Sequence, residues 1–220
     1  HWSTGAWLEL VDFRSNNRGE QSAGYDVDGW GLSGGWEKKF GKVYAGLSGS
    51  WISGSTSTED FQSTDLTKYE AALHARFEEG PFNAFARAGY FWVSSDFTDT
   101  FTGEIDDTEF TYGSTADWSG QGYTGLAGIS YGFKAGDRLT LRPKVVLDYF
   151  RLDENGYETT ADSDAIALTV GDRVSDRMSV KPSLVASYQL QRGPESEQPF
   201  TLELEGGYRS ILSGSLGTLT

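Results

Sequence analysis

The chain has 220 residues, no Cys and 32 Asp and Glu against 18 Lys and Arg, giving a formal net charge of −14. The lack of Cys excludes disulfides and thiolate metal sites, and the acidic balance argues against a nucleic-acid partner, which would need Lys and Arg on one face. No stretch approaches the roughly 20 consecutive apolar residues of a membrane helix. A membrane β-barrel stays compatible with this composition, because only every second residue of a barrel strand faces lipid.

Segments in which apolar and polar residues alternate recur along the whole chain. In Lys68–Phe77, for example, Tyr69, Leu73 and Phe77 fall on one face of an extended strand, and Lys68, Glu70 and His74 fall on the other. The same period of two predicts nine strands, at Thr4–Phe13, Asp26–Glu37, Val43–Ser53, Leu66–Phe77, Phe82–Ser94, Gly120–Phe133, Leu139–Arg151, Val174–Leu190 and Phe200–Arg209.

The connections between these strands alternate strictly in length. Short connections are expected at Lys38–Lys42, Glu78–Pro81, Lys134–Arg138 and Gln191–Gln198, and long ones at Arg14–Gly24, Gly54–Asp65, Ser95–Ser119 and Leu152–Arg173. Outer-membrane barrels have short periplasmic turns and long extracellular loops. The chain is therefore predicted to be all-β, an up-and-down antiparallel transmembrane β-barrel in the bacterial outer membrane, with its long loops outside and its short turns in the periplasm.

Two of the long connections are acidic. Ser95–Ser119 and Leu152–Asp172 contain several Asp and Glu residues but no Lys or Arg. Such loops either bind divalent cations or stay solvated, and solvation is favoured because no spacing matches an EF-hand loop. We therefore expect no cofactor and no metal site.

The alternation divides the side chains into two predicted sets. The lipid-facing set is Trp30, Leu32, Trp36, Leu47, Trp51, Tyr69, Leu73, Phe77, Tyr90, Trp92, Tyr131, Leu147, Tyr149, Leu184, Tyr188, Leu204 and Tyr208. The lumen-facing polar set is Lys68, Glu70, His74, Arg76, Arg87, Arg142, Lys144, Asp148, Lys181, Glu203, Glu205 and Arg209. In a soluble barrel or sandwich the apolar face would be the core, and small residues such as Ala84, Ala86 and Ala88 would have to fill it. The membrane interpretation is favoured.

The predicted lumen carries charges of both signs. They either neutralise each other in a wet interior, which is the favoured interpretation, or also bind a polar chain that passes through. Catalysis is not expected, because His1 and His74 are the only His residues and no serine triad or Gly-x-Ser-x-Gly turn is present.

The order of Gly and aromatic residues resembles a known family. The stretches Tyr25–Trp36, Val43–Trp51 and Gly125–Tyr131, with Leu141–Tyr149 after them, are similar to the autotransporter translocator domain of type V secretion, and the resemblance covers nearly the whole chain. It implies a single translocator domain over residues 1–220, a 12-stranded barrel with a helix through its pore, and export of an N-terminal passenger.

Nine strands are fewer than the family's twelve, and single-chain bacterial barrels close with even strand numbers. The expectation is thus a C-terminally incomplete barrel, captured as a truncated assembly intermediate. Its expected partners are outer-membrane lipids, a passenger polypeptide and, as a hypothesis, the barrel insertion machinery. The alternative is a small outer-membrane pore or an adhesin-like barrel with acidic external loops.

Overall fold

The computed structural model describes residues 4–17, 24–58, 61–105, 108–163, 166–190 and 200–215. The long strands are β1 (Thr4–Asn17), β2 (Tyr25–Phe40), β3 (Val43–Thr58), β4 (Gln62–Glu79), β5 (Phe82–Ile105), β6 (Thr108–Tyr131), β8 (Leu139–Glu154) and β12 (Arg173–Gln189). The shorter ones are β7 (Phe133–Lys134), β9 (Tyr157–Glu158), β10 (Thr160–Ala161), β11 (Thr169–Val170), β13 (Thr201–Gly207) and β14 (Ser210–Ser215). Among the described residues there is no helix long and apolar enough to cross a membrane.

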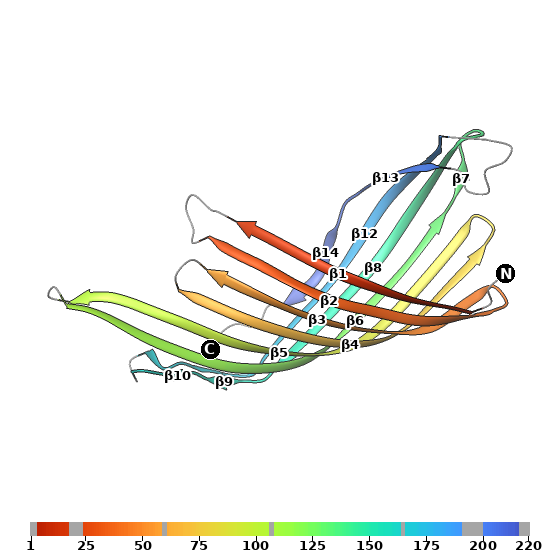
Figure 1. The fold of residues 1–220 in the computed structure, drawn as a ribbon. Coiled ribbons are helices and arrows are strands. Elements are labelled where there is room, and N and C mark those ends of the chain that lie inside the picture. Colours follow the sequence, from red (N-terminus) through yellow and green to blue (C-terminus); the bar gives the residue numbers. More distant parts are fainter. Residues whose placement is uncertain are drawn as a thin grey trace.

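The long strands pair with their neighbours in chain order. The sheet runs β1-β2-β3-β4-β5-β6-β8-β12-β13, and every ladder in it is antiparallel. Figure 1 shows these strands bending together as one curved sheet. This is the up-and-down meander of a transmembrane β-barrel, and it confirms the predicted fold class. Within the described residues the barrel is not closed, because no ladder joins β1 to β13 or β14.

Several strands are longer than the sequence predicted. The expected long loop at Ser95–Ser119 is mostly strand, because β5 and β6 pair continuously as far as Ile105 opposite Thr108. Phe97, Phe101 and Phe110 continue the alternation through this acidic segment. The expected loop at Gly54–Asp65 is likewise mostly strand, and β1 extends to Asn17. The expected loops are wrong because the period of two continues through the Asp, Ser and Thr side chains of these segments.

The region expected as the loop Leu152–Arg173 also contains strands. β9 pairs with β11, and β10 adds to the edge of β6, where Thr160 lies opposite Thr115. The β5–β6 hairpin projects beyond its neighbours at one end of the sheet (Figure 1). The expected short connection at Gln191–Gln198 lies outside the described residues.

Tight turns lie at the other end of the sheet. β2 and β3 are joined by Gly41 and Lys42, and β4 and β5 by Gly80 and Pro81. Gly41 has φ of 63° and Gly80 has φ of 58°. Glycine adopts this left-handed conformation without the steric cost of a Cβ atom. The turns therefore explain the short connections that the sequence predicted here.

The ladders place most of the apolar and most of the charged side chains on opposite faces of the sheet, with Lys38 and the Arg151–Asp153 ion pair among the exceptions. We call the face of Lys68, Glu70 and Arg76 the charged face, and the face of Tyr69 and Leu73 the apolar face. The buried side chains of the main sheet, among the described residues, all lie on the charged face: Ala72, Phe91, Val93, Ala116, Val185, Ser95, Glu154 and Ser179. Side chains are therefore crowded together on the charged face and spread apart on the apolar face.

Glycines on β6 accommodate aromatic rings on the charged face. Phe91 lies opposite Gly122 and Phe85 opposite Gly128. A Cβ atom at Gly122 would lie 2.5 Å from Cζ of Phe91, and one at Gly128 would lie 2.5 Å from Cζ of Phe85. Each ring thus covers the backbone of the next strand, which adds apolar contact to a face that is otherwise charged.

Candidate functional site

The candidate site is the charged face, where side chains from different strands form ion pairs. Glu70 on β4 is one of two carboxylates on this face whose side chains are only 7% exposed, the other being Glu154. The Glu70 carboxylate lies 2.8 Å from Lys68 Nζ and 2.6 Å from Arg87 Nη2. It also accepts a hydrogen bond from the Thr124 hydroxyl at 3.1 Å. A carboxylate this buried is stable only when paired, and these three donors supply that pairing.

Aromatic rings complete the surroundings of Glu70. Lys68 Nζ lies 4.5 Å from the centroid of the Phe91 ring, and Phe91 stacks on Phe150 with centroids 5.5 Å apart. A cation over a ring face is attracted by the ring quadrupole. Lys68 is therefore held from both sides, by a carboxylate and by an aromatic face.

A second cluster lies nearer the tight turns, on β2 and β4. Arg76 donates to both carboxylate oxygens of Glu37, at 2.6 and 3.2 Å, and also contacts Glu78. Its guanidinium lies 3.8 Å from the centroid of the Tyr44 ring, and His74 Nε2 is 3.9 Å from Glu37. Arg76 therefore links β4 to β2 across β3.

A third cluster joins β8, β12 and β13. Arg142 pairs with Glu203 at 3.1 Å, and Glu205 lies between Lys181 at 3.0 Å and Lys144 at 3.8 Å. Arg142, Lys144, Glu203 and Glu205 line a groove of about 500 Å³ together with Asn83, Phe85 and Ser130. The groove offers both signs of charge and an aromatic ring, so it suits a polar or amphipathic peptide segment.

Two further ion pairs lie toward the projecting end of the sheet. Arg177 is 3.9 Å from Asp148, and Arg173 donates to both oxygens of Glu154 at 2.5 and 2.6 Å. This bidentate pair connects the first residue of β12 to the last residue of β8.

Of the twelve residues predicted for the lumen, eleven take part in these clusters, and their lumenal position remains a prediction. They are Lys68, Glu70, His74, Arg76, Arg87, Arg142, Lys144, Asp148, Lys181, Glu203 and Glu205. Arg209 lies in the gap between β13 and β14. Because Gly207 pairs with Ser183 and Ser210 with Val180, Arg209 falls opposite Lys181, beside Pro182, which has no N–H for the ladder.

Sequence reasoning missed Glu37, Arg177, Arg173 and Glu154 as partners. The signal for two of them was present, because Glu37 alternates with Trp36 and Arg177 with Met178. Glu154 and Arg173 fell in a region expected to be a loop.

The residues predicted to face lipid share the other face. The ladder aligns Leu32, Trp51, Tyr69 and Trp92 in one row, and Trp36, Leu47, Leu73 and Tyr149 belong to another. Trp30, Phe77, Tyr90, Tyr131, Leu147, Leu184, Tyr188 and Leu204 have the same parity, and Tyr208 donates its N–H to Pro182 near the end of β13. Their contact with lipid remains a prediction.

Within the part of the chain that the structure describes, no group of three or more His, Cys, Asp or Glu side chains is arranged to hold a metal ion. The chemistry that these residues offer is polar contact and ion pairing.

Comparisons with known proteins place the chain in a family. The profile of the autotransporter beta-domain matches residues 6–219. No curated protein matched the sequence. Among solved structures, the translocator domain of the autotransporter NalP from Neisseria meningitidis aligns with a TM-score of 0.72 and 11% identity, over 100% of this chain and 72% of that one.

The beta domain of the Bordetella autotransporter BrkA aligns with a TM-score of 0.61 and 12% identity, over 98% of this chain and 82% of that one. At these identities the structural likeness shows the fold, and the family match shows the membership. The chain belongs to the autotransporter β-domain family, the outer-membrane translocator barrels of type V secretion.

Proposed function

We propose that this chain spans the outer membrane and supports the export of a passenger polypeptide to the cell surface. The observation that carries the proposal is the division of one sheet into an apolar face and an ion-paired charged face. Leu73 is 62% exposed and Tyr69 54% exposed on the apolar face, whereas Glu70, between them in sequence, is nearly buried among cations. Such a sheet matches a barrel with lipid outside and water inside.

The charged face then lines the path of the passenger. Its carboxylates and cations are already paired with each other, as in the clusters of Glu70 and Glu205. A lining of neutralised ion pairs offers hydrogen bonds to a passing backbone but no deep apolar surface on which the chain would stall. Passage is therefore tolerant of sequence, as a general export route requires.

The export proposal is tested with a reporter peptide fused ahead of residue 1 and expressed with a secretion signal. We expect an added protease to reach the reporter on intact cells. A barrel that is inserted and heat-resistant on gels, with its reporter still in the periplasm, would contradict export but not insertion.

We also propose a sidedness, with the tight turns in the periplasm and the β5–β6 hairpin outside. The proposal is supported by the difference between two-residue turns at one end and the projecting hairpin at the other. Cysteines introduced at Glu104 and Asp137, both exposed, test it in the Cys-free chain. On intact cells a membrane-impermeant maleimide should label Glu104→Cys and leave Asp137→Cys unmodified, and the reverse pattern would invert the topology.

The open edges suggest a partner during assembly. The outer edge of β1, among the described residues, has no neighbouring strand, and each unsatisfied backbone group in hydrocarbon costs several kcal/mol. We propose that the barrel insertion machinery pairs with an edge strand. A photo-crosslinker at Leu10 on β1 should give an adduct with another outer-membrane barrel protein, whereas the same crosslinker at Leu73, in the middle of the sheet, should not. Equal adducts at both positions would argue against edge pairing.

A further inference from the structure

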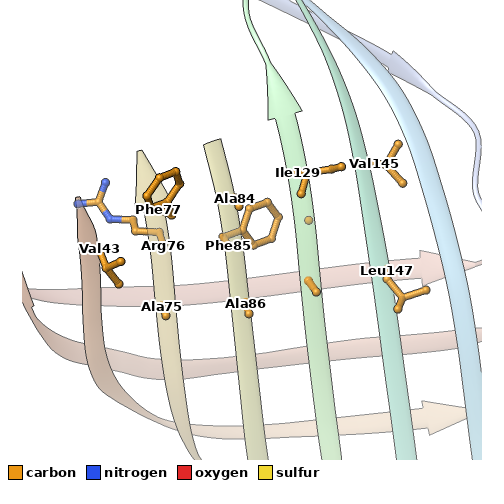
Figure 2. A pocket seen from close by; sticks show the side chains of 12 residues that line it. Val43, Ala75, Arg76, Phe77, Ala84, Phe85, Ala86, Ile129, Val145 and Leu147 are labelled. Carbon is orange, nitrogen blue, oxygen red and sulfur yellow. The ribbon is translucent and has the colours of Figure 1, made fainter. Parts of the chain in front are cut away.

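The apolar face contains a hollow near its tight-turn end. It has a volume of about 440 Å³. The residues that line it come from β3, β4, β5, β6 and β8, and Figure 2 shows Val43, Ala75, Ala86, Ile129 and Val145 on these strands. Ala127 also lines it. The hollow is apolar, open to the side, and surrounded by larger side chains.

The ladder explains the depth of this hollow. Ala45, Ala75, Ala86 and Ala127 are aligned in one row across β3, β4, β5 and β6. In the row toward the tight turns, Phe77 and Ile129 lie on either side of Ala84. The alanine methyl groups are shorter than the side chains around them, so they form the floor of the hollow. The hollow extends across several strands, which suits a hydrocarbon chain.

A lysine lies beside the hollow on the same face. Lys38 is opposite Ala45, which is opposite Ala75, so it is two strand spacings, or about 10 Å, from the hollow. Its Nζ lies 5.5 Å from the Phe40 ring centroid, and Phe40 is the next apolar-face residue toward the turn. The side chain thus extends toward the end of the sheet, as a lysine does when it reaches from hydrocarbon to a headgroup region.

The charge of Lys38 is available. Within the described residues no carboxylate forms an ion pair with Lys38, whereas Lys42 in the same turn pairs with Glu79. The neighbouring Lys39 is turned to the other face, where its Nζ lies 4.9 Å from the Tyr44 ring centroid. Lys38 is therefore the cation of this turn that combines membrane-side placement with an unneutralised charge.

We propose that this hollow and Lys38 form a binding site for one anionic phospholipid of the inner leaflet. An acyl chain occupies the alanine-floored hollow, and the phosphate pairs with the Lys38 ammonium at the turn end. The inference rests on the proposed membrane placement, in which the apolar face meets lipid and the tight turns are periplasmic. Membrane placement alone requires only contact with lipid. The proposed site adds a preference for lipids with an anionic headgroup over lipids without net charge.

A second copy of this chain fits the same hollow less well. Two barrels in one membrane share the same up-and-down orientation, so contact through this face would bring two Lys38 residues to the same depth. Like charges at close range in a region of low dielectric repel each other. The lysine therefore favours an anionic lipid over a dimer.

Native mass spectrometry of the purified chain tests the site. The chain is released from detergent micelles that contain equal amounts of phosphatidylglycerol and phosphatidylethanolamine with the same acyl chains. We expect the wild type to retain phosphatidylglycerol about fivefold more than phosphatidylethanolamine, the contribution of one lysine near an anionic membrane surface. Lys38→Gln should abolish this preference, and the matched Lys39→Gln should keep it.

A second pair of variants tests the hollow itself. Ala86→Phe fills the hollow and should lower the retention of both lipids severalfold. Ala88→Phe, on the same strand and face but not lining the hollow, should behave as wild type. Equal retention of the two lipids by the wild type, equal effects of Lys38→Gln and Lys39→Gln, or a dimer free of lipid would each overturn the proposal. Export of the reporter peptide by Lys38→Gln should be unchanged. This measurement distinguishes failure of the lipid site from failure of the proposed export function.

Discussion

The two faces of this sheet keep their side chains in place by different means. On the charged face, partners lie within the protein, and Glu70 is held by Lys68 and Arg87 with 7% of its side chain exposed. On the apolar face, Leu73 is 62% exposed, so its favourable contacts must come from what surrounds the molecule. The charged face is therefore specified by pairing inside the chain, and the apolar face by the medium that surrounds it.

The largest effect is expected when a charge is moved to the wrong face. Leu73→Arg should destabilise the membrane-inserted state by about 2–4 kcal/mol, the cost of Arg near the bilayer midplane on a lipid-facing strand. The adjacent His74→Arg, on the charged face near Glu37, should cost much less. Denaturant titration of the chain folded into lipid vesicles measures both, and equal costs would refute the assignment of the faces.

Removing the buried anion should have the next largest effect. Glu70→Gln leaves Lys68 and Arg87 without their carboxylate, and we expect a loss of about 1–3 kcal/mol in the free energy of unfolding. Glu203→Gln is the matched control, because its side chain is 55% exposed and solvent screens its pair with Arg142. The same vesicle titration checks the difference, and a Glu203 variant that costs as much as the Glu70 variant would show that burial is not the cause.

Replacing glycine by alanine should have different effects on the stability of the crowded charged face and of the open apolar face. Gly122→Ala presses a Cβ atom against the backbone carbonyl oxygen of Arg151 and places it 2.5 Å from the Phe91 ring, and it should cost about 1–3 kcal/mol through overpacking. In Gly125→Ala, three residues along the same strand on the apolar face, the nearest atom is 3.5 Å away, so no loss is expected. Unfolding of both variants by denaturant provides the measurement, and a loss at Gly125 alone would reverse the comparison.

The smallest effect is expected at the tight turns, which belong to neither face. Gly41→Ala forces a Cβ atom into a backbone with φ of 63° and should cost about 1 kcal/mol. Gly206→Ala on β13 has no atom within 4 Å of the added Cβ and no left-handed backbone, so it serves as the control. A shift in the denaturation midpoint for Gly41→Ala alone would confirm that the turn conformation is responsible.

The division into faces could be predicted from sequence because it depends only on the period of two within each strand. Lys68, Glu70 and Arg76 were assigned to one face without knowledge of any neighbour. The pairing of Glu70 with Arg87 could not be predicted, because it depends on the register of β4 against β5, in which Glu70 lies opposite Phe91. Sequence reasoning also ended strands too early where acidic and hydroxyl side chains replaced aliphatic ones, as in β5 beyond Ser94.

The end of the sheet shows a second limit. Opposite the gap between β13 and β14, Pro182 has no N–H to donate, although its carbonyl oxygen accepts a hydrogen bond from the Tyr208 N–H, and the register shifts between Met178 and Ser179. The alternation of side chains along β13, counted onward from Glu203, therefore does not predict which side chains of β14 lie on the charged face. A bulge of one residue cannot be read from composition, because it reverses parity without changing residue types.

The uninterrupted pairing of β5 with β6 also has a mechanical consequence. From Ser95 to Ile105 the two strands form a continuous ribbon, about 35 Å long at the rise of an antiparallel strand. On the proposed topology this two-stranded ribbon is a stiff projection that extends above the membrane surface. An epitope inserted between Ile105 and Thr108 would be displayed at a set height above the membrane, where an antibody added to intact cells should bind it.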